Sequence, residues 1–312
     1  MIPMNTAAWK ELPSRRDFMK AGGVVIAGMS VGAPLVRAAG KDESSDVVLR
    51  FGIVTDMHYA DAPPRYKRFY RKSSAKLREC VELMNHEKVS FLVELGDMKD
   101  QNPKPAREST LRYLAEIETV FCGFKGARYH VPGNHDMDSI SKADFMGAVQ
   151  NSGIAAGRSF YSFDTAGLHF IVLDANYTKA GHDYNSGDFD WRDANIPKPQ
   201  LDWLKTDLKT SAAPAIVFVH QLLDGAGDMY INNAVAVRKV LEESGRVLAV
   251  FQGHHHDGSY SLINKIHYYT LKALVDGEKK EDNAYAIVEV QRSGDITVKG
   301  YRRAVNYSLH HA

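Results

Sequence analysis

The sequence lacks the features typical of nucleic-acid-binding, disulfide-rich or membrane-spanning proteins. Its 39 basic and 38 acidic residues nearly cancel to a net charge of +1, so electrostatics give no reason to expect nucleic acid or an anionic membrane as a partner. Only two cysteines are present, Cys80 and Cys122, and they could be buried free thiols or one disulfide. The apolar stretch at residues 21–36 is diluted by glycine and serine, whereas a membrane span needs roughly 20 apolar residues. We therefore expect no nucleic-acid partner and no stable membrane span.

The first forty residues have the pattern of an export signal. Arg15 and Arg16 lie in the run SRRDFMK, which resembles the twin-arginine export motif, and the apolar stretch follows it. Small or branched residues at Val36 and Ala38 predict cleavage after Ala38 or Ala39, with an uncleaved anchor or a chance match to the motif as the alternatives. The twin-arginine export machinery is then a partner, and the mature chain is periplasmic or otherwise exported. The predicted organisation is a twin-arginine signal peptide, a linker and one domain, at residues 1–39, 40–46 and 47–312.

Five apolar runs, each predicted to be a buried strand, are followed by side chains that suit metal chemistry. The runs lie at residues 49–54, 91–95, 129–131, 215–219 and 247–251. The motifs that follow them are Asp56-Met57-His58, Gly96-Asp97, Gly133-Asn134-His135-Asp136, His220, and Gly253-His254-His255-His256. In sheets that are fed by helices, binding sites gather at the carboxyl ends of the strands, so these five loops can converge on one crevice.

These motifs, in this order, resemble the signature of the calcineurin-like metallophosphoesterase family, over residues 49–257. The resemblance implies an α/β fold, a two-sheet β-sandwich flanked by helices, with a metal site at the carboxyl ends of the strands. The rest of the chain agrees with this fold, because predicted helices separate the strands and three more strands follow. Those tail strands are expected at residues 267–271, 284–291 and 296–301, and Ser73 is expected to cap a helix that ends near residue 87.

Hydrolysis of a phosphate ester requires a nucleophile, charge neutralisation and a proton donor. Two metal ions roughly 3.5–4 Å apart supply the first two, because they acidify a shared water and clamp the phosphoryl oxygens. Ions so close repel each other and need an anionic bridge, for which we choose Asp97. The family resemblance implies the remaining ligands: Asp56, His58 and His256 for the first metal, and Asn134, His220 and His254 for the second. Imidazole, carboxylate and amide ligands suit Mn, Fe or Zn without distinguishing them.

Other polar residues of these loops have predicted supporting parts. The resemblance makes His135 the residue that protonates the leaving oxygen, and Asp136 is expected to orient its ring. An extended segment would aim His254 and His256 at one face, with His255 pointing away. Taken alone, each motif has an ordinary structural interpretation, such as a turn aspartate or a core histidine. The five together favour a metal centre.

Further similarities extend over nearly the whole chain after the signal. The pieces FGI, YAD, FIVLDA, QLDWL and HDG resemble one branch of the family, the manganese-dependent ADP-ribose/CDP-alcohol diphosphatase-like proteins. This implies a small-molecule phosphoester or nucleotide-type substrate that is cleaved at a phosphodiester or pyrophosphate bond. The basic and aromatic run at residues 65–72 could bind a second phosphate or a base, or could be a solvated charge run. Many family members have Pro two residues after the fourth-motif histidine, but Gln221 and Leu222 follow His220 here. The rival functions are a phosphomonoesterase of alkaline phosphatase type and a non-catalytic scaffold.

Overall fold

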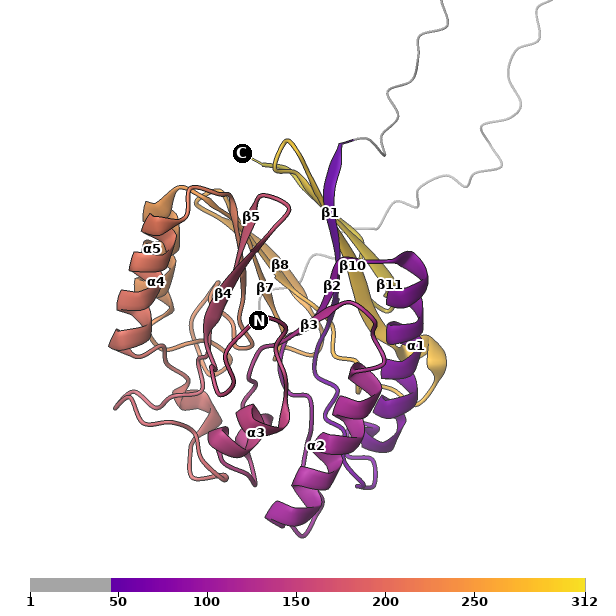
Figure 1. The fold of residues 1–312 in the computed structure, drawn as a ribbon. Helices are drawn as coiled ribbons and strands as arrows, with labels where there is room; N and C mark the ends of the chain where they lie inside the picture. Colours follow the sequence, from indigo (N-terminus) through magenta and orange to yellow (C-terminus); the bar gives the residue numbers. More distant parts are fainter. Residues whose placement is uncertain (1–45, 312) are drawn as a thin grey trace, which may run out of the picture. The chain divides into compact units, whose positions relative to one another are not determined.

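The computed structural model describes residues 46–311, so the predicted signal peptide and nearly all of the predicted linker lie outside the described residues. Two six-stranded sheets form the framework (Figure 1). The first contains, in spatial order, β12 (Tyr307–Leu309), β11 (Ile296–Arg302), β10 (Ala284–Gln291), β1 (Val47–Val54), β2 (Phe91–Glu94) and β3 (Ala127–His130). The second contains β4 (Tyr161–Thr165), β5 (Leu168–Val172), β6 (Ala215–Phe218), β7 (Val247–Gln252), β9 (Ile266–Thr270) and β8 (Ser259–Ile263). The predicted two-sheet sandwich is confirmed.

Each sheet contains a block of parallel strands, which brings the carboxyl ends of those strands to one edge. In the first sheet β1, β2 and β3 run parallel, while β10, β11 and β12 add antiparallel strands on the other side of β1. In the second sheet β5, β6, β7 and β9 run parallel, with β4 and β8 antiparallel at the two edges. The five strands predicted to carry the site therefore belong to the two parallel blocks, three in one sheet and two in the other.

Aromatic side chains fill the space between the two sheets. Phe51 of β1 is fully buried and stacks on Phe91 with ring centroids 4.8 Å apart. Its ring also meets Phe170, Phe218 and Phe251 of the second sheet edge-on, at 5.6–6.0 Å. Edge-to-face pairs at such distances are favourable beyond the apolar area they bury. The two sheets are thus held face to face by a rigid core directly behind the loops that follow β1, β6 and β7.

Helices cover the outer faces of both sheets, as Figure 1 shows. The first sheet packs against α1 (Ser73–Glu87), α2 (Arg107–Phe121) and α3 (Lys142–Ala148). The second sheet packs against α4 (Lys198–Thr210) and α5 (Ala234–Ser244). Each helix buries one apolar face, as in α5, where Val237, Val240 and Leu241 lie against the sheet. Among the described residues, none of the helices has the length and apolar character needed to cross a membrane.

A few local predictions differ from the structure. Ser73 is the first residue of α1 and not its N-cap, because the helix continues directly from a 3-10 turn at Tyr70–Lys72. Strands β8 and β12 were not predicted, since both are short edge strands without a continuous apolar run. Within residues 46–311 both cysteines are free thiols, but only Cys80 is buried, whereas Cys122 is exposed at the end of α2.

Candidate metal centre

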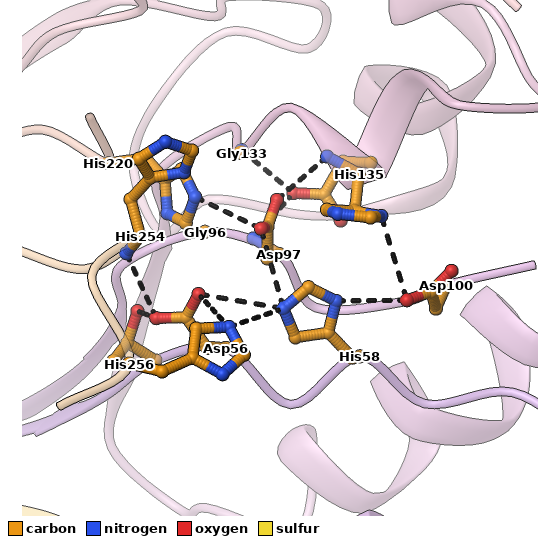
Figure 2. A network of polar contacts seen from close by, with 12 residues as sticks. Asp56, His58, Gly96, Asp97, Asp100, Gly133, His135, His220, His254 and His256 are labelled. Carbon is orange, nitrogen blue, oxygen red and sulfur yellow. Dashed lines mark hydrogen bonds and ion pairs between the residues drawn. The ribbon is translucent and has the colours of Figure 1, made fainter. Parts of the chain in front are cut away.

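The structure brings six of the seven predicted metal ligands together at the carboxyl ends of the strands. The seventh, Asn134, directly precedes His135, whose backbone nitrogen donates a hydrogen bond of 2.8 Å to Asp97 Oδ1. The loops after β1, β2 and β3 reach this place from the first sheet, and those after β6 and β7 reach it from the second. Figure 2 shows the rings of His58, His220 and His256 turned toward the carboxylates of Asp56 and Asp97, and the backbone nitrogen of His254 bonded to Asp56. Six of the seven predicted ligands are buried, and His256 is half-buried. The predicted convergence of separate loops is therefore present in the fold.

Three of these residues form a first cluster with the spacing of ligands around a single ion. The Oδ1 atom of Asp56 lies 3.6 Å from His58 Nε2 and 3.5 Å from His256 Nε2, and the two Nε2 atoms are 3.2 Å apart. Ligand atoms held at about 2.1 Å in a tetrahedral site stand about 3.4 Å from one another. The three distances therefore fit ligands of one cation. Without a cation, the two facing Nε2 atoms of His58 and His256 would have to share one proton.

A second cluster contains Asp97, His220 and His254, all buried. The Oδ2 atom of Asp97 lies 3.1 Å from His220 Nε2, and it also lies 3.5 Å from His58 Nε2 of the first cluster. Asp97 thus stands between the two groups. This is the position that the predicted bridge between two metal ions requires.

Unpaired buried atoms show that these residues suit a metal ion. Four polar atoms of predicted ligands are buried and have no hydrogen-bond partner among the described residues: Asp56 Oδ1, Asn134 Oδ1, His220 Nε2 and His254 Nε2. More than nine in ten buried polar groups in folded proteins are hydrogen-bonded, so four such atoms without a hydrogen bond in one crevice are unusual. Two of them, Asp56 Oδ1 and His220 Nε2, instead face other predicted ligands at 3.1–3.6 Å. Oxygen and imidazole nitrogen atoms of this kind are good ligands for transition metals. The donor set therefore fits the predicted cofactor.

The backbone of the centre is held in a left-handed conformation at four predicted ligands. The φ angles are 53° at Asp56, 45° at His58, 57° at Asp97 and 66° at His254. Such angles cost of order 1–3 kcal/mol each for residues other than glycine and persist only where the surroundings impose them. Hydrogen bonds between adjacent loops do so here, from Asp56 N to Gly96 O at 3.0 Å and from His58 N to Asp97 O at 2.8 Å.

The turn after β7 differs from the predicted extended segment. Because His254 is left-handed, the chain bends there, and the bend is closed by a hydrogen bond from His255 N to Gly253 O at 2.7 Å. His254 therefore joins the second cluster and His256 the first, as the assignment by resemblance requires. The two side chains are divided between the clusters by this tight turn and not by alternation along a strand.

The other ring nitrogen has a partner that fixes the ring in three of the four clustered histidines. His58 Nδ1 lies 3.1 Å from Asp100 Oδ2, and His256 Nδ1 lies 2.9 Å from Asp276 Oδ1. His220 Nδ1 lies 2.8 Å from the Leu95 carbonyl oxygen, to which it donates. An acceptor at Nδ1 leaves the lone pair at Nε2 free to face a metal. The sequence analysis did not find Asp276, which belongs to none of the motifs.

The charge states of the centre are set by burial and by neighbouring charges. Burial alone would raise the pKa of Asp97, but His220 and His135 outweigh it and hold that pKa well below its usual range. Burial would lower the pKa of His220, yet the Asp97 carboxylate raises it to about 9. For His254, burial and then the neighbouring His220 lower the pKa to about 3, which keeps this imidazole neutral and able to bind a cation.

His135 lies beside the first cluster and carries the features of a proton donor. Its Nδ1 atom is 3.2 Å from Asp138 Oδ2 and 3.6 Å from Asp100 Oδ2, while Arg68 Nη1 lies 3.4 Å from Nε2. Burial would lower the pKa of His135, but Asp100 and Asp97 raise it well above its ordinary value. An anionic oxygen placed beside Nε2 would meet both the imidazole and the guanidinium group.

Asp136 has a different part from the predicted one. Its carboxylate accepts hydrogen bonds from the backbone amides of Asp97, Met98 and Gly133 at 3.0–3.1 Å and 2.8 Å, and it is fully buried. The 3-10 turn at His135–Met137 sends consecutive side chains in different directions, so adjacency in sequence does not bring Asp136 to the ring. Asp136 joins the loops after β2 and β3, and Asp138 and Asp100 orient His135.

A pocket of about 500 Å³ opens beside His135. Its wall includes Arg65, Arg68 and Tyr70 from the basic and aromatic run, together with Asp100 and Asn102. The other basic residues of the run pair with exposed carboxylates: Lys67 with Asp257, Arg71 with Asp61, and Lys72 with Glu278. One part of the run therefore lines the pocket and the other part is paired at the surface. Of the basic residues in the run, Arg65 and Arg68 are the ones that line the pocket beside His135.

Comparisons with known proteins agree with this geometry. A family model described as calcineurin-like phosphoesterase matches residues 49–258, which is more than half of the chain. The chain belongs to this family. As a calcineurin-like phosphoesterase with two ligand clusters, it is a metal-dependent phosphoester hydrolase with two metal ions. The predictions of the enzyme class and of the cofactors are confirmed, and a non-catalytic scaffold is not supported.

Similar sequences and structures belong to phosphatases. A rice (Oryza sativa subsp. japonica) protein named manganese-dependent ADP-ribose/CDP-alcohol diphosphatase is 24% identical over 278 residues, covering 75% of this chain and 85% of the relative. A protein of the same name from Xenopus tropicalis is 26% identical over 294 residues, covering 72% and 84%. A dimetal phosphatase from Danio rerio has a similar fold, with a TM-score of 0.72 at 22% sequence identity, covering 86% of this chain and 100% of that one.

Proposed function

We propose that this calcineurin-like phosphoesterase hydrolyses phosphodiester or pyrophosphate bonds of small molecules, with nucleoside diphosphate-linked compounds as its substrate class. In this proposal Asp97 would be shared by two metal sites. Asp56, His58 and His256 would complete the first site, and Asn134, His220 and His254 would complete the second. The observation that supports these roles most strongly is the set of four buried, unpaired ligand atoms, which are divided between the two proposed sites. The names of the relatives favour manganese as the metal.

The chain's own residues would then divide the work of the reaction. Two bound cations would acidify a water molecule and neutralise charge on the phosphoryl oxygens. His135 would donate the proton at Nε2 to the leaving oxygen, because Asp138 and Asp100 hold its Nδ1 atom and favour the protonated ring. Asp100 also holds Nδ1 of His58, so one carboxylate would set the positions of both a metal ligand and the proton donor.

The pocket beside His135 supports a substrate with a charged leaving group. A group that takes its proton from His135 must leave on that side of the centre, where Arg65 and Arg68 line the pocket. Guanidinium groups pair with phosphate through two parallel hydrogen bonds, so a leaving group that carries its own phosphate would be favoured. Pyrophosphate compounds have such a leaving group. A phosphomonoester with a neutral alcohol would leave Arg68 without a phosphate to bind.

A substrate panel tests this function. The metal-loaded protein should cleave ADP-ribose and a CDP-alcohol faster than p-nitrophenyl phosphate, and bis-p-nitrophenyl phosphate should also be a substrate. The panel should be run with added Mn, Zn and Fe, since the ligand types accept all three. Preference for p-nitrophenyl phosphate over every diester and pyrophosphate would favour the phosphomonoesterase alternative. No turnover of any member with any metal would contradict the proposal.

The proposal includes export through the twin-arginine pathway. Residues 1–39 would be the signal peptide, removed after Ala38 or Ala39, and the domain at residues 47–312 would act in the periplasm or outside the cell. The pathway carries folded proteins, which suits an enzyme whose metal centre is built from loops of two sheets. Support for this part comes from the sequence motif around Arg15 and Arg16.

A further inference from the structure

One buried side chain lies where the two sheets meet at the metal centre. Asn176 follows β5 of the second sheet and is fully buried. Its Nδ2 atom donates a hydrogen bond of 2.7 Å to the carbonyl oxygen of Pro132, which belongs to the loop after β3 in the first sheet. Pro132 stands two residues before Asn134, the proposed amide ligand of the second metal site. Asn176 therefore connects the loop of that ligand to the opposite sheet.

The other end of the same amide is held by the loop after β6. Gln221 Nε2 donates a hydrogen bond of 2.7 Å to Asn176 Oδ1, and Gln221 is also fully buried. This residue directly follows His220, the proposed histidine ligand of the second site, in the segment where the chain departs from the family pattern. The Asn176 amide thus joins two loops, and each of them carries a ligand of the same metal site.

The orientation of the Asn176 amide is fixed by its surroundings. Asp174 Oδ1 accepts hydrogen bonds from the backbone N and from Nδ2 of Asn176, at 2.9 and 3.0 Å. Lys142 Nζ lies 2.7 Å from Asp174 Oδ2 and donates to the Asn176 carbonyl oxygen at 2.9 Å. With Nδ2 committed to two acceptors and Oδ1 to one donor, the amide cannot turn over without losing all three bonds. Hydrogen bonds strengthen one another in buried networks of this kind and so hold the Asn176 amide in place, whereas Gln221 Oε1 has no hydrogen-bond partner among the described residues.

The first metal site is held together in a different way. There the two sheets are joined by backbone hydrogen bonds of residues 273–275: Ala273 N donates to His256 O and Val275 N donates to Asp56 O, both at 3.1 Å. No contact of Asn176 or Gln221 with the loops of Asp56, His58 or His256 is among the hydrogen bonds of the described residues. A change at Asn176 should therefore reach one site and spare the other.

We propose that Asn176 and Gln221 form a clamp that positions Asn134 against His220, so that the affinity of the second metal site depends on it. The inference rests on the proposed metal centre. His220 is also held by the Leu95 carbonyl oxygen, so Asn134 is the ligand whose position depends most on the clamp. Asn176 and Gln221 are positioning residues in this account, since they act through the loops that they join. Many family members have proline at the position that Leu222 occupies here. Gln221, which directly precedes that position, is the positioning residue from the loop after β6.

Calorimetric titration of the metal-free protein with Mn²⁺ tests the clamp. The wild type should bind two ions per chain, and Asn176→Ala should keep one site unchanged while the other weakens about 10–100-fold, the usual effect of losing a residue that supports a metal ligand. The matched control is Asn283→Ala, which removes an equally buried asparagine whose Nδ2 bonds Lys76 O, away from both loops. The control should lower the melting temperature and leave both affinities unchanged.

A second variant and a spectroscopic signal keep the test decisive. Gln221→Met removes the donor to Asn176 with little change in volume and should weaken the same site less, because the bond to Pro132 remains. With two equivalents of Mn²⁺ per chain, electron paramagnetic resonance should show a coupled Mn pair in the wild type. In Asn176→Ala the same amount of Mn²⁺ should give the signal of isolated Mn, because the weakened second site is only partly filled. Equal weakening of both sites, or affinities as unchanged as in Asn283→Ala, would overturn the clamp. A wild type that does not bind two ions would instead overturn the proposed centre.

Discussion

Substituting Gly133 by alanine perturbs the centre at its most crowded point. A Cβ atom at this position would lie well inside contact distance of the backbone nitrogen and the Oδ1 atom of Asp97, and 2.9 Å from the carbonyl carbon of Gly96. With this Cβ atom present, the backbone at Gly133 and the Asp97 carboxylate cannot both keep their positions. Because the side chain of Asp97 is buried and shared between the two clusters, the added methyl group should displace the bridge.

The expected size of the effect has two parts. Overpacking costs about 1–3 kcal/mol, which for a chain of this size lowers the melting temperature by about 2–4 °C per kcal/mol. The second part is lost stabilisation by metal. At a metal concentration of 100 times the dissociation constant, binding stabilises the wild type by about 2.7 kcal/mol per site. If the displaced bridge weakens binding about 100-fold, the same concentration stabilises the variant by about 0.4 kcal/mol per site.

Thermal unfolding with and without Mn²⁺ measures both parts. Gly133→Ala should melt below the wild type without metal and should show little further rise when Mn²⁺ is added. The control is Gly147→Ala, because no atom lies within 4 Å of the Cβ position there and the residue lies inside α3. Alanine at such a helical position should be neutral or stabilising by up to about 1 kcal/mol, with a normal metal response. A wild-type metal response in Gly133→Ala would refute the reasoning.

Four further predictions concern separate parts of the molecule. His135→Ala should lower kcat by about 10²–10⁴-fold with unchanged Mn²⁺ affinity in the same calorimetric assay, and loss of metal would show that His135 is a ligand. Arg68→Ala should raise KM for ADP-ribose by about 10–100-fold and change KM for bis-p-nitrophenyl phosphate much less; equal changes would contradict a bound leaving-group phosphate. Each ring nitrogen of His169 lies 2.8 Å from a carboxylate oxygen, one of Asp164 and one of Asp207. Both carboxylates raise the pKa of His169, and Asp207 on α4 has the larger effect. The stability that protonated His169 contributes is complete below its unfolded-state pKa of about 6.5 and is lost as the pH rises through its higher folded-state pKa. The difference in melting temperature between the wild type and His169→Gln should therefore shrink from pH 6 to pH 9. Replacing Arg15 and Arg16 together by Lys should leave the protein in the cytoplasm of a twin-arginine-competent host; unchanged export in cell fractions would contradict the signal assignment.

The sequence was sufficient to predict which loops meet but not how their side chains are held. Residues such as Asp56 and His220 follow apolar runs, so the general rule for strand ends located them without knowledge of the strand order. Asp276 could not be found in this way. It lies beyond the last motif, and only the pairing of β7 with β9 brings its segment to His256. Partners that come from another part of the chain leave no local pattern.

Local geometry accounts for the remaining differences. Asp136 was predicted to orient the adjacent His135, but a 3-10 turn separates the two side chains and gives that part to Asp138, three residues away. The division of His254 and His256 between two clusters depends on a left-handed residue, which alternation along a strand cannot predict. Residues other than glycine are rare in that conformation, so sequence rules give it little weight.

The central claim is that one carboxylate is shared by two cations at the junction of the sheets. Diffraction data collected at the manganese absorption edge from crystals of the Mn-loaded protein test it most directly. The account predicts two anomalous peaks roughly 3.5–4 Å apart, with Asp97 in contact with both and Asn134 in contact with one. A single peak, or two peaks of which only one touches Asp97, would contradict it.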